Sequence, residues 1–148
     1  MNQATEARTS KTIVIVEDDR TTAKILEIQL ASLGYRISHI FASPREAIRE
    51  IHRYGPDLVI IGVSFPGDLD GIEAASILHA IFEIPIVFLT ASTEQETITR
   101  AMRARPSGYI VKPPDQSKLR GTLTAAFTAG TDKPGNVPDR TPEAVNPV

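Results

Sequence analysis

A regular alternation of short apolar runs with longer segments of helical periodicity, between Thr12 and Phe127, most constrains how this chain folds. The run Leu58–Ile61 is continuously apolar, which is typical of a strand covered on both faces of a sheet. The other runs are rich in β-branched or aromatic residues, which also favours strands. The predicted strands are Thr12–Val16, Tyr35–Ile40, Leu58–Ile61, Ile86–Leu89 and Tyr109–Val111.

Each predicted strand is followed by a segment in which apolar residues recur at helical spacing. Gly34 is expected to cap the first helix at its C-terminus. Ser43-Pro44-Arg45-Glu46 and Thr93-Glu94-Gln95-Glu96 read as capping boxes that open the second and fourth helices. The first, third and fifth helices are predicted at about Arg20–Leu33, Asp70–Phe82 and Asp115–Phe127.

Strands that alternate with helices indicate a parallel sheet with helices on both faces. We therefore predict an α/β fold of the flavodoxin-like (βα)5 type, a three-layer sandwich with strand order 2-1-3-4-5. The predicted domain spans 11–129, after a flexible leader at 1–10. Residues 130–148 are predicted to be a disordered tail or linker, because 131–148 hold four prolines and few large apolar side chains.

Composition argues against several classes of protein. The formal net charge is −2, whereas general binders of nucleic acid or of anionic membranes need a basic surface. The chain has no cysteine, which removes thiolate metal sites and thiol nucleophiles. No apolar stretch reaches the roughly 20 residues of a membrane span. We expect a cytoplasmic protein that binds neither nucleic acid directly nor a membrane.

Polar side chains follow the predicted strands at the edge where working sites of such folds lie. Glu17 and Asp18 follow the first strand, Thr90 the fourth, and Lys112 the fifth. Singly, an acidic residue or Thr90 can be a helix cap and Lys112 a solvated charge. Together they predict one polar site.

Five motifs in order resemble the receiver domains of response regulators in two-component signalling. The resemblance covers about Lys11–Phe127. It rests on Ile15-Val16-Glu17-Asp18-Asp19, Pro56-Asp57-Leu58-Val59-Ile60-Ile61, Pro66-Gly67-Asp68-Leu69-Asp70-Gly71-Ile72-Glu73-Ala74-Ala75, Ile84-Pro85-Ile86-Val87-Phe88-Leu89-Thr90-Ala91 and Gly108-Tyr109-Ile110-Val111-Lys112-Pro113.

The resemblance implies a role for each residue at this edge. Glu17 and Asp18, with the backbone carbonyl of Ser64, match the family's magnesium ligands. Thr90 and Lys112 match the residues that hold phosphoryl oxygens, and Tyr109 matches the aromatic residue of the switch. The Lys112–Pro113 bond matches one that is cis in the family.

One position departs from the family pattern. Gly62 stands where the resemblance places the phosphate-accepting aspartate. Glycine supplies no carboxylate to attack phosphorus, so we expect no phosphorylation there. With a carboxylate missing, we expect weak or no magnesium binding, and Lys112 to neutralise a larger share of the repulsion among the remaining acids. No resident cofactor is expected.

The resulting interpretation is a degenerate receiver, not an enzyme, that acts through protein–protein contacts. Its expected partner is a histidine kinase or a downstream signalling protein. The family's partner face, which also permits a homodimer, matches the fourth helix, fifth strand and fifth helix, with Arg100, Arg103, Tyr109 and Lys118. Arg100 and Arg103 also fit a solvated helix end.

Two alternatives stay open at this point. Gly62 could be a variant or engineered form of a phosphoacceptor aspartate in an ordinary phosphorelay receiver. A nucleotide- or flavin-binding protein on the same fold is the more remote alternative. Against it, the turn Glu17-Asp18-Asp19-Arg20 is acidic and lacks the glycines of a phosphate-binding loop.

Overall fold

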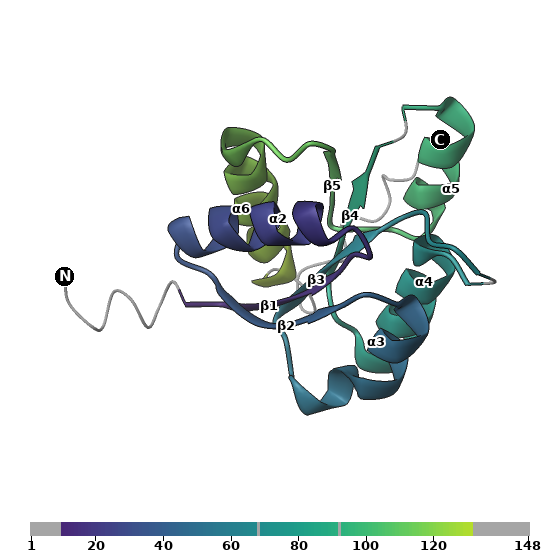
Figure 1. Ribbon diagram of the computed structural model, residues 1–148, viewed down its shortest axis with the longest axis horizontal. Helices are drawn as coiled ribbons and strands as arrows, with labels where there is room; N and C mark the ends of the chain where they lie inside the picture. The colour runs from purple at the N-terminus through teal and green to yellow at the C-terminus, as the bar shows by residue number, and fades with distance from the viewer. Residues whose placement is uncertain (1–9, 68, 92, 132–148) are drawn as a thin grey trace.

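The computed structural model describes residues 10–67, 69–91 and 93–131 and shows one parallel five-stranded sheet (Figure 1). The strand order is β2-β1-β3-β4-β5, as predicted. The strands are β1 (Thr12–Val16), β2 (Arg36–Phe41), β3 (Leu58–Gly62), β4 (Ile86–Thr90) and β5 (Gly108–Val111). The helices are α2 (Arg20–Ser32), α3 (Pro44–Glu50), a 3-10 turn (Ile51–Arg53), α4 (Gly71–Phe82), α5 (Gln95–Arg103) and α6 (Gln116–Thr131).

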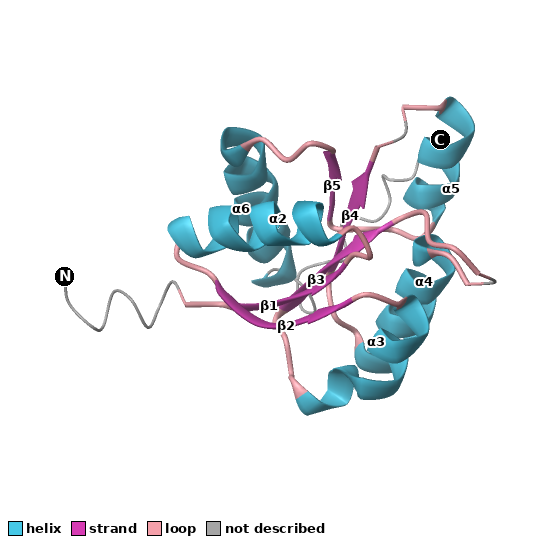
Figure 2. Ribbon diagram, in the orientation of Figure 1, coloured by secondary structure: helices cyan, strands magenta, loops and turns pink. Residues whose placement is uncertain are grey.

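Two helical layers cover the sheet, with α2 and α6 on one face and α3, α4 and α5 on the other (Figure 2). Strand residues alternate between the two faces. Ile13 and Ile60 pack with Leu119 of α6, whereas Val14 packs with Leu78 of α4. Both faces of the central strands are therefore buried, which explains the continuous apolar run at β3 and confirms the flavodoxin-like prediction.

Short side chains start the helices where the sequence predicted them. The Ser43 hydroxyl accepts a hydrogen bond from Glu46 N–H at the start of α3. Asp70 and Glu73 form a reciprocal capping box at the start of α4. Gly34 follows α2 with φ of 97°, the left-handed conformation expected after a helix end.

The predicted capping box at Thr93 is wrong. The chain stays extended through Glu94, with φ −69° and ψ 135°, so α5 begins at Gln95 and Thr93 lies outside it. Glu94 is the N-cap residue and its side chain makes no capping hydrogen bond. A Thr-x-x-Glu pattern is a local signal, and here it does not decide where the helix starts.

Helix α6 continues to Thr131, beyond the predicted helix end at Phe127 and the predicted domain end at 129. The rest of the predicted tail, 132–148, and residues 1–9 of the predicted leader lie outside the described residues, so these boundaries stay predictions. Among the helices described, none combines the length and the apolar character that a membrane crossing requires.

Candidate functional site at the carboxyl ends of the strands

Glu17 extends the pairing of β1 by one residue and turns its carboxylate into the protein. Its N–H donates to the Phe41 carbonyl at 2.9 Å, and the residue is only 3% exposed. Oε2 accepts a hydrogen bond from Asp19 N–H at 2.9 Å. Oε1 lies 3.0 Å from Lys112 Nζ. A buried carboxylate is thus held between one backbone donor and one ammonium group.

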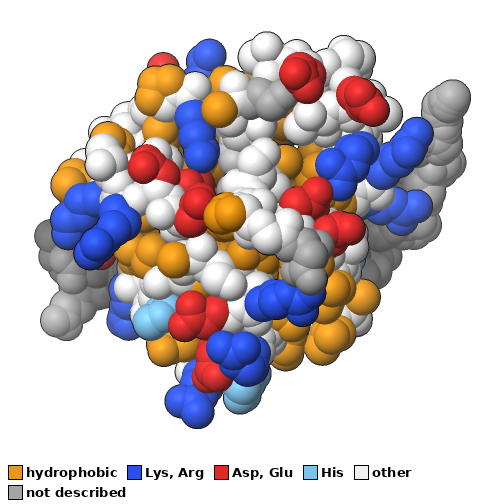
Figure 3. Space-filling model, turned by 45° about the vertical axis from the view of Figure 1, so that its right-hand side comes forward, with side chains coloured by type: hydrophobic (Ala, Val, Ile, Leu, Met, Phe, Trp, Pro, Cys, Tyr) orange, Lys and Arg blue, Asp and Glu red, His pale blue; other side chains and the backbone are white. Residues whose placement is uncertain are grey.

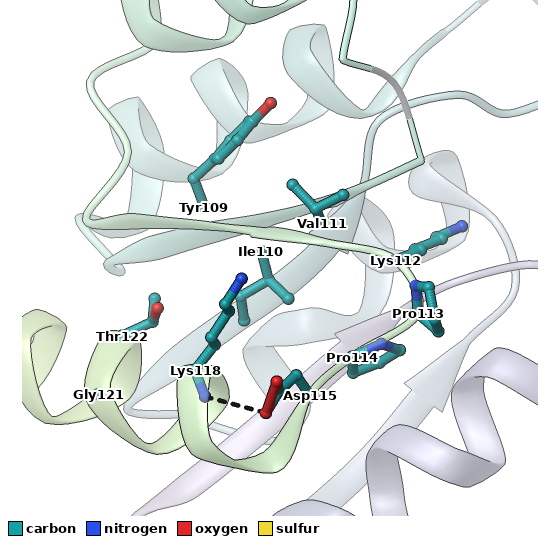
Figure 4. Close-up of a pocket in the computed structure, with 10 residues that line it drawn as sticks. All are labelled: Tyr109, Ile110, Val111, Lys112, Pro113, Pro114, Asp115, Lys118, Gly121 and Thr122. Atoms are coloured by element: carbon teal, nitrogen blue, oxygen red, sulfur yellow. Dashed lines mark hydrogen bonds between the residues drawn. The ribbon is translucent and has the colours of Figure 1, made fainter.

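Lys112 reaches this carboxylate from the end of β5. Its backbone N–H donates to the Thr90 carbonyl at 2.8 Å, which aligns it with the end of β4. The Lys112–Pro113 bond is cis, as the sequence resemblance implied. Figure 4 shows the Lys112 side chain extending away from Lys118, which projects from α6. Both lysines line the cavity between β5 and α6, but the Lys112 ammonium is paired with Glu17.

Gly62 ends β3 between these groups and faces a filled space. A Cβ atom at this position would lie 2.8 Å from Glu17 Oε1 and 3.4 Å from Phe65 Cζ. The first distance is shorter than a non-bonded contact to carbon allows. The volume that a side chain at position 62 would need is therefore taken by the Glu17 carboxylate.

Gly71 approaches the same strand end from the start of α4. A Cβ atom on Gly71 would lie 1.7 Å from the Gly62 carbonyl oxygen. Gly71 N–H donates to the Val63 carbonyl at 2.8 Å. The loop after β3 thus folds back onto its own strand, and only glycine permits this approach. Sequence analysis named Gly71 only as part of a motif and assigned it no role of its own.

A cavity of about 410 Å³ opens beside these residues and brings together three predicted site residues, Ser64, Thr90 and Lys112. Thr90 is 3% exposed, whereas Ser64 is exposed. Asp18 is exposed and lines a different cavity, of about 260 Å³, with Glu17 and Arg20. The structure thus brings both predicted phosphoryl-binding residues to one cavity and divides the predicted metal ligands between two.

Arg100, predicted for a partner face, is engaged within the molecule. Its guanidinium lies 2.8 Å from Asp70 Oδ2, and the ion pair links α5 to the start of α4. Burial alone would raise the pKa of Asp70. The hydrogen bonds from Glu73 N–H and Arg100, together with the positive charge of Arg100, have the larger effect and hold the pKa of Asp70 below its usual value. The same contact raises the pKa of Arg100.

The other predicted partner-face residues divide between interior and surface. Tyr109 packs against the core on the α4 side, and its hydroxyl is buried without a hydrogen bond from any residue that the structure describes. Figure 4 shows Tyr109 and Ile110 on opposite sides of β5. Arg103 and Lys118 are exposed, and so is Val111, at 44%.

A larger cavity, of about 830 Å³, lies between β5 and α6, lined in part by Val111, Lys118 and Gly121. On the face shown in Figure 3, positive and negative side chains are interspersed with apolar ones. That surface is mixed in charge, in keeping with the net charge of −2.

Comparison with known proteins places this geometry in a family. The sequence profile of the response regulator receiver domain matches residues 13–124. Among solved structures, the signal receiver domain of a modulated diguanylate cyclase from Desulfovibrio desulfuricans G20 superposes with a TM-score of 0.77 at 37% identity, covering 82% of this chain and 97% of that one. The N-terminal domain of a response regulator/sensory box/GGDEF 3-domain protein from Carboxydothermus hydrogenoformans gives 0.73 at 27%, covering 82% and 98%.

A curated relative, the DNA-binding response regulator MtrA of Mycolicibacterium paratuberculosis, is 28% identical over 125 residues, which cover 84% of this chain and 55% of that protein. The chain therefore spans about half the length of this relative. The profile match and the strand order agree, and Lys112 meets Glu17 in an ion pair and Thr90 at one cavity: the chain belongs to the response regulator receiver domains of two-component signalling.

Proposed function

We propose that this receiver is not phosphorylated at the family's usual position and signals through protein–protein contacts. The observation that carries the proposal is Gly62, which offers no carboxylate and whose side-chain space is taken by Glu17. Formation of an aspartyl phosphate requires a carboxylate oxygen in line with the phosphorus of the donor. The end of β3 therefore lacks the nucleophile, and a side chain there would have to displace the Glu17 carboxylate.

Among the residues that the structure describes, we propose that none of Asp57, Ser64 and Asp70 replaces the missing carboxylate. Asp57 lies before β3, at the opposite end of the strand, where its Oδ2 accepts a hydrogen bond from Thr12 N–H at 2.8 Å. Asp70 is committed to the α4 cap and to Arg100. Ser64 lines the cavity with Lys112 but carries a hydroxyl rather than a carboxylate. The site keeps the groups that would hold a phosphoryl group and lacks the group that would accept it.

For the signalling surface we propose the face formed by α5, β5 and α6. Exposed Val111, Arg103 and Lys118 supply apolar and basic contacts, and the cavity between β5 and α6 adds a concave region. A histidine kinase or downstream signalling protein is the proposed partner, and a second copy of the chain fits the same face. A protein is favoured over nucleic acid as the direct partner because the net charge is −2. No enzymatic activity is proposed.

Intact-mass spectrometry after incubation with acetyl phosphate and Mg²⁺ tests the absence of phosphorylation. We expect no phosphoryl adduct on the wild-type chain. A stoichiometric adduct, at Ser64 or elsewhere in the domain, would refute the proposal. A receiver with an aspartate at the acceptor position, treated in parallel, confirms that the donor is active.

A second candidate is an ordinary phosphorelay receiver in which Gly62 replaces an aspartate. The cavity lined by both Thr90 and Lys112 favours it, because these two residues match those that hold phosphoryl oxygens in the family. This candidate predicts that Gly62→Asp alone restores the adduct. A Gly62→Asp protein that folds and stays unmodified counts against it.

A further inference from the structure

We propose that the Lys112 ammonium is the resident cation of this site and that, by pairing with Glu17, it closes the site to divalent metal. Glu17 is then a positioning residue, which holds Lys112 and fills the space above Gly62. This inference rests on the proposed function, because it explains how a receiver that lacks the acceptor carboxylate stabilises the buried charge of Glu17.

The burial of Glu17 requires a compensating charge. The side chain is 2% exposed, and a carboxylate removed from water is stable only when it is paired and hydrogen-bonded. Asp19 N–H satisfies Oε2. Oε1 receives no hydrogen bond from any residue in the described ranges, and its close polar neighbour is Lys112 Nζ at 3.0 Å. The positive charge of Lys112 therefore compensates for the loss of hydration at Oε1.

The position of Glu17 and the absence of a side chain at 62 depend on each other. Oε1 lies 2.8 Å from where a Cβ on Gly62 would stand. A side chain at position 62 would displace the carboxylate from this place. Glycine thus allows Glu17 to lean across the end of β3 toward Lys112, even though β3 and β4 separate their two strands in the sheet.

The oxygen ligands at this edge do not fit a divalent cation of the kind the family binds. Magnesium requires about six oxygens in octahedral geometry. Both Glu17 oxygens are already engaged, and Asp18 and Ser64 line different cavities. In the described part of the chain, no cluster of three or more Asp, Glu, His or Cys is arranged to hold a metal. A metal would have to displace Lys112 to reach Glu17.

Thermal unfolding with and without millimolar Mg²⁺ tests the proposal in three proteins, the wild type, Lys112→Met and, as a matched control, Lys118→Met. Lys118 is an exposed residue of α6, and its side chain extends away from Lys112. We expect no effect of Mg²⁺ on the melting temperature of the wild type or of Lys118→Met. Lys112→Met is expected to melt several degrees lower and to regain part of the loss in Mg²⁺, because Glu17 is then free to bind the added cation.

Three results would overturn the proposal: a wild type that Mg²⁺ stabilises, a Lys112→Met protein as stable as Lys118→Met, or a destabilised Lys112→Met indifferent to Mg²⁺. If Lys112→Met does not fold, its refolding yield is measured with and without Mg²⁺. A higher yield in the presence of Mg²⁺ supports the proposal, and an unchanged yield opposes it. The mass assay reads phosphorylation separately. A wild type that binds Mg²⁺ but takes no phosphoryl group refutes this inference alone, whereas a phosphoryl adduct refutes the proposed function.

Discussion

Replacing Gly62 by alanine should destabilise the domain, although alanine is usually the more stabilising of the two residues. The new Cβ would stand 2.8 Å from Glu17 Oε1, so this carboxylate must move. Its movement strains the contacts to Lys112 and to Asp19 N–H. Overpacking a filled site costs about 1–3 kcal/mol, and because Glu17 can swing partly aside we expect about 1–2 kcal/mol. For a domain of this size that corresponds to a melting temperature lower by roughly 4–8 °C.

Gly121→Ala supplies the matched control for calorimetry or thermal circular dichroism. Gly121 lies within α6, where an added Cβ meets nothing within 4 Å. The same chemical change should therefore stabilise there by about 0.5–1 kcal/mol, because alanine is the better helix former. The two variants are predicted to shift the melting temperature in opposite directions.

A second background isolates the cause of the effect. Glu17→Asp shortens the side chain that occupies the space, so Gly62→Ala should cost clearly less in that background than in the wild type. If Gly62→Ala melts at or above the wild-type temperature, the carboxylate does not fill the space beside β3 and the reasoning fails. An equal cost in both backgrounds would show that Glu17 is not the residue displaced.

Three further predictions concern the elements around the site. Gly71→Ala should cost at least about 3 kcal/mol in denaturant unfolding, because its Cβ would lie 1.7 Å from the Gly62 carbonyl oxygen; a near-neutral result would contradict that close packing. Tyr109→Phe should leave stability unchanged or raise it by up to about 1 kcal/mol, since it removes a buried, unsatisfied hydroxyl, and a clear loss would reveal a partner for that group. Asp70→Asn keeps a capping side chain but loses the Arg100 ion pair, so at pH 7 it should be about 0.5–1 kcal/mol less stable. Because the pKa of Asp70 is lowered by folding, this difference should be full well above pH 3.8 and should vanish as the pH falls through the folded pKa; a difference independent of pH would rule out the charge as its cause.

The fold was predictable because its signals are local and repeated. Five apolar runs separated by helical periodicity leave few topologies, and right-handed crossovers between parallel strands select among them. The cap at Ser43 followed from residue type alone. The start of α5 could not be predicted in this way. The Thr93 pattern indicates a helix start, but the chain after β4 stays extended through Glu94.

The site was predictable in outline but not in its contacts. Parallel strands bring their carboxyl ends to one edge, so the convergence of Glu17, Thr90 and Lys112 followed from topology. The ion pair between Lys112 and Glu17 was not predictable. It depends on how far the two side chains extend across the ends of two intervening strands, and on the space left by the absence of a side chain at Gly62. Local patterns likewise give no information on a contact between positions as far apart in sequence as Arg100 and Asp70.

A crystal structure of the wild-type chain grown with Mg²⁺ and the phosphomimetic BeF₃⁻ would test the central claim most directly. The account predicts electron density for neither species at the end of β3, with Lys112 Nζ still about 3.0 Å from Glu17 Oε1. A magnesium ion coordinated by Glu17 and Asp18, with Lys112 turned away toward a bound beryllofluoride, would contradict it.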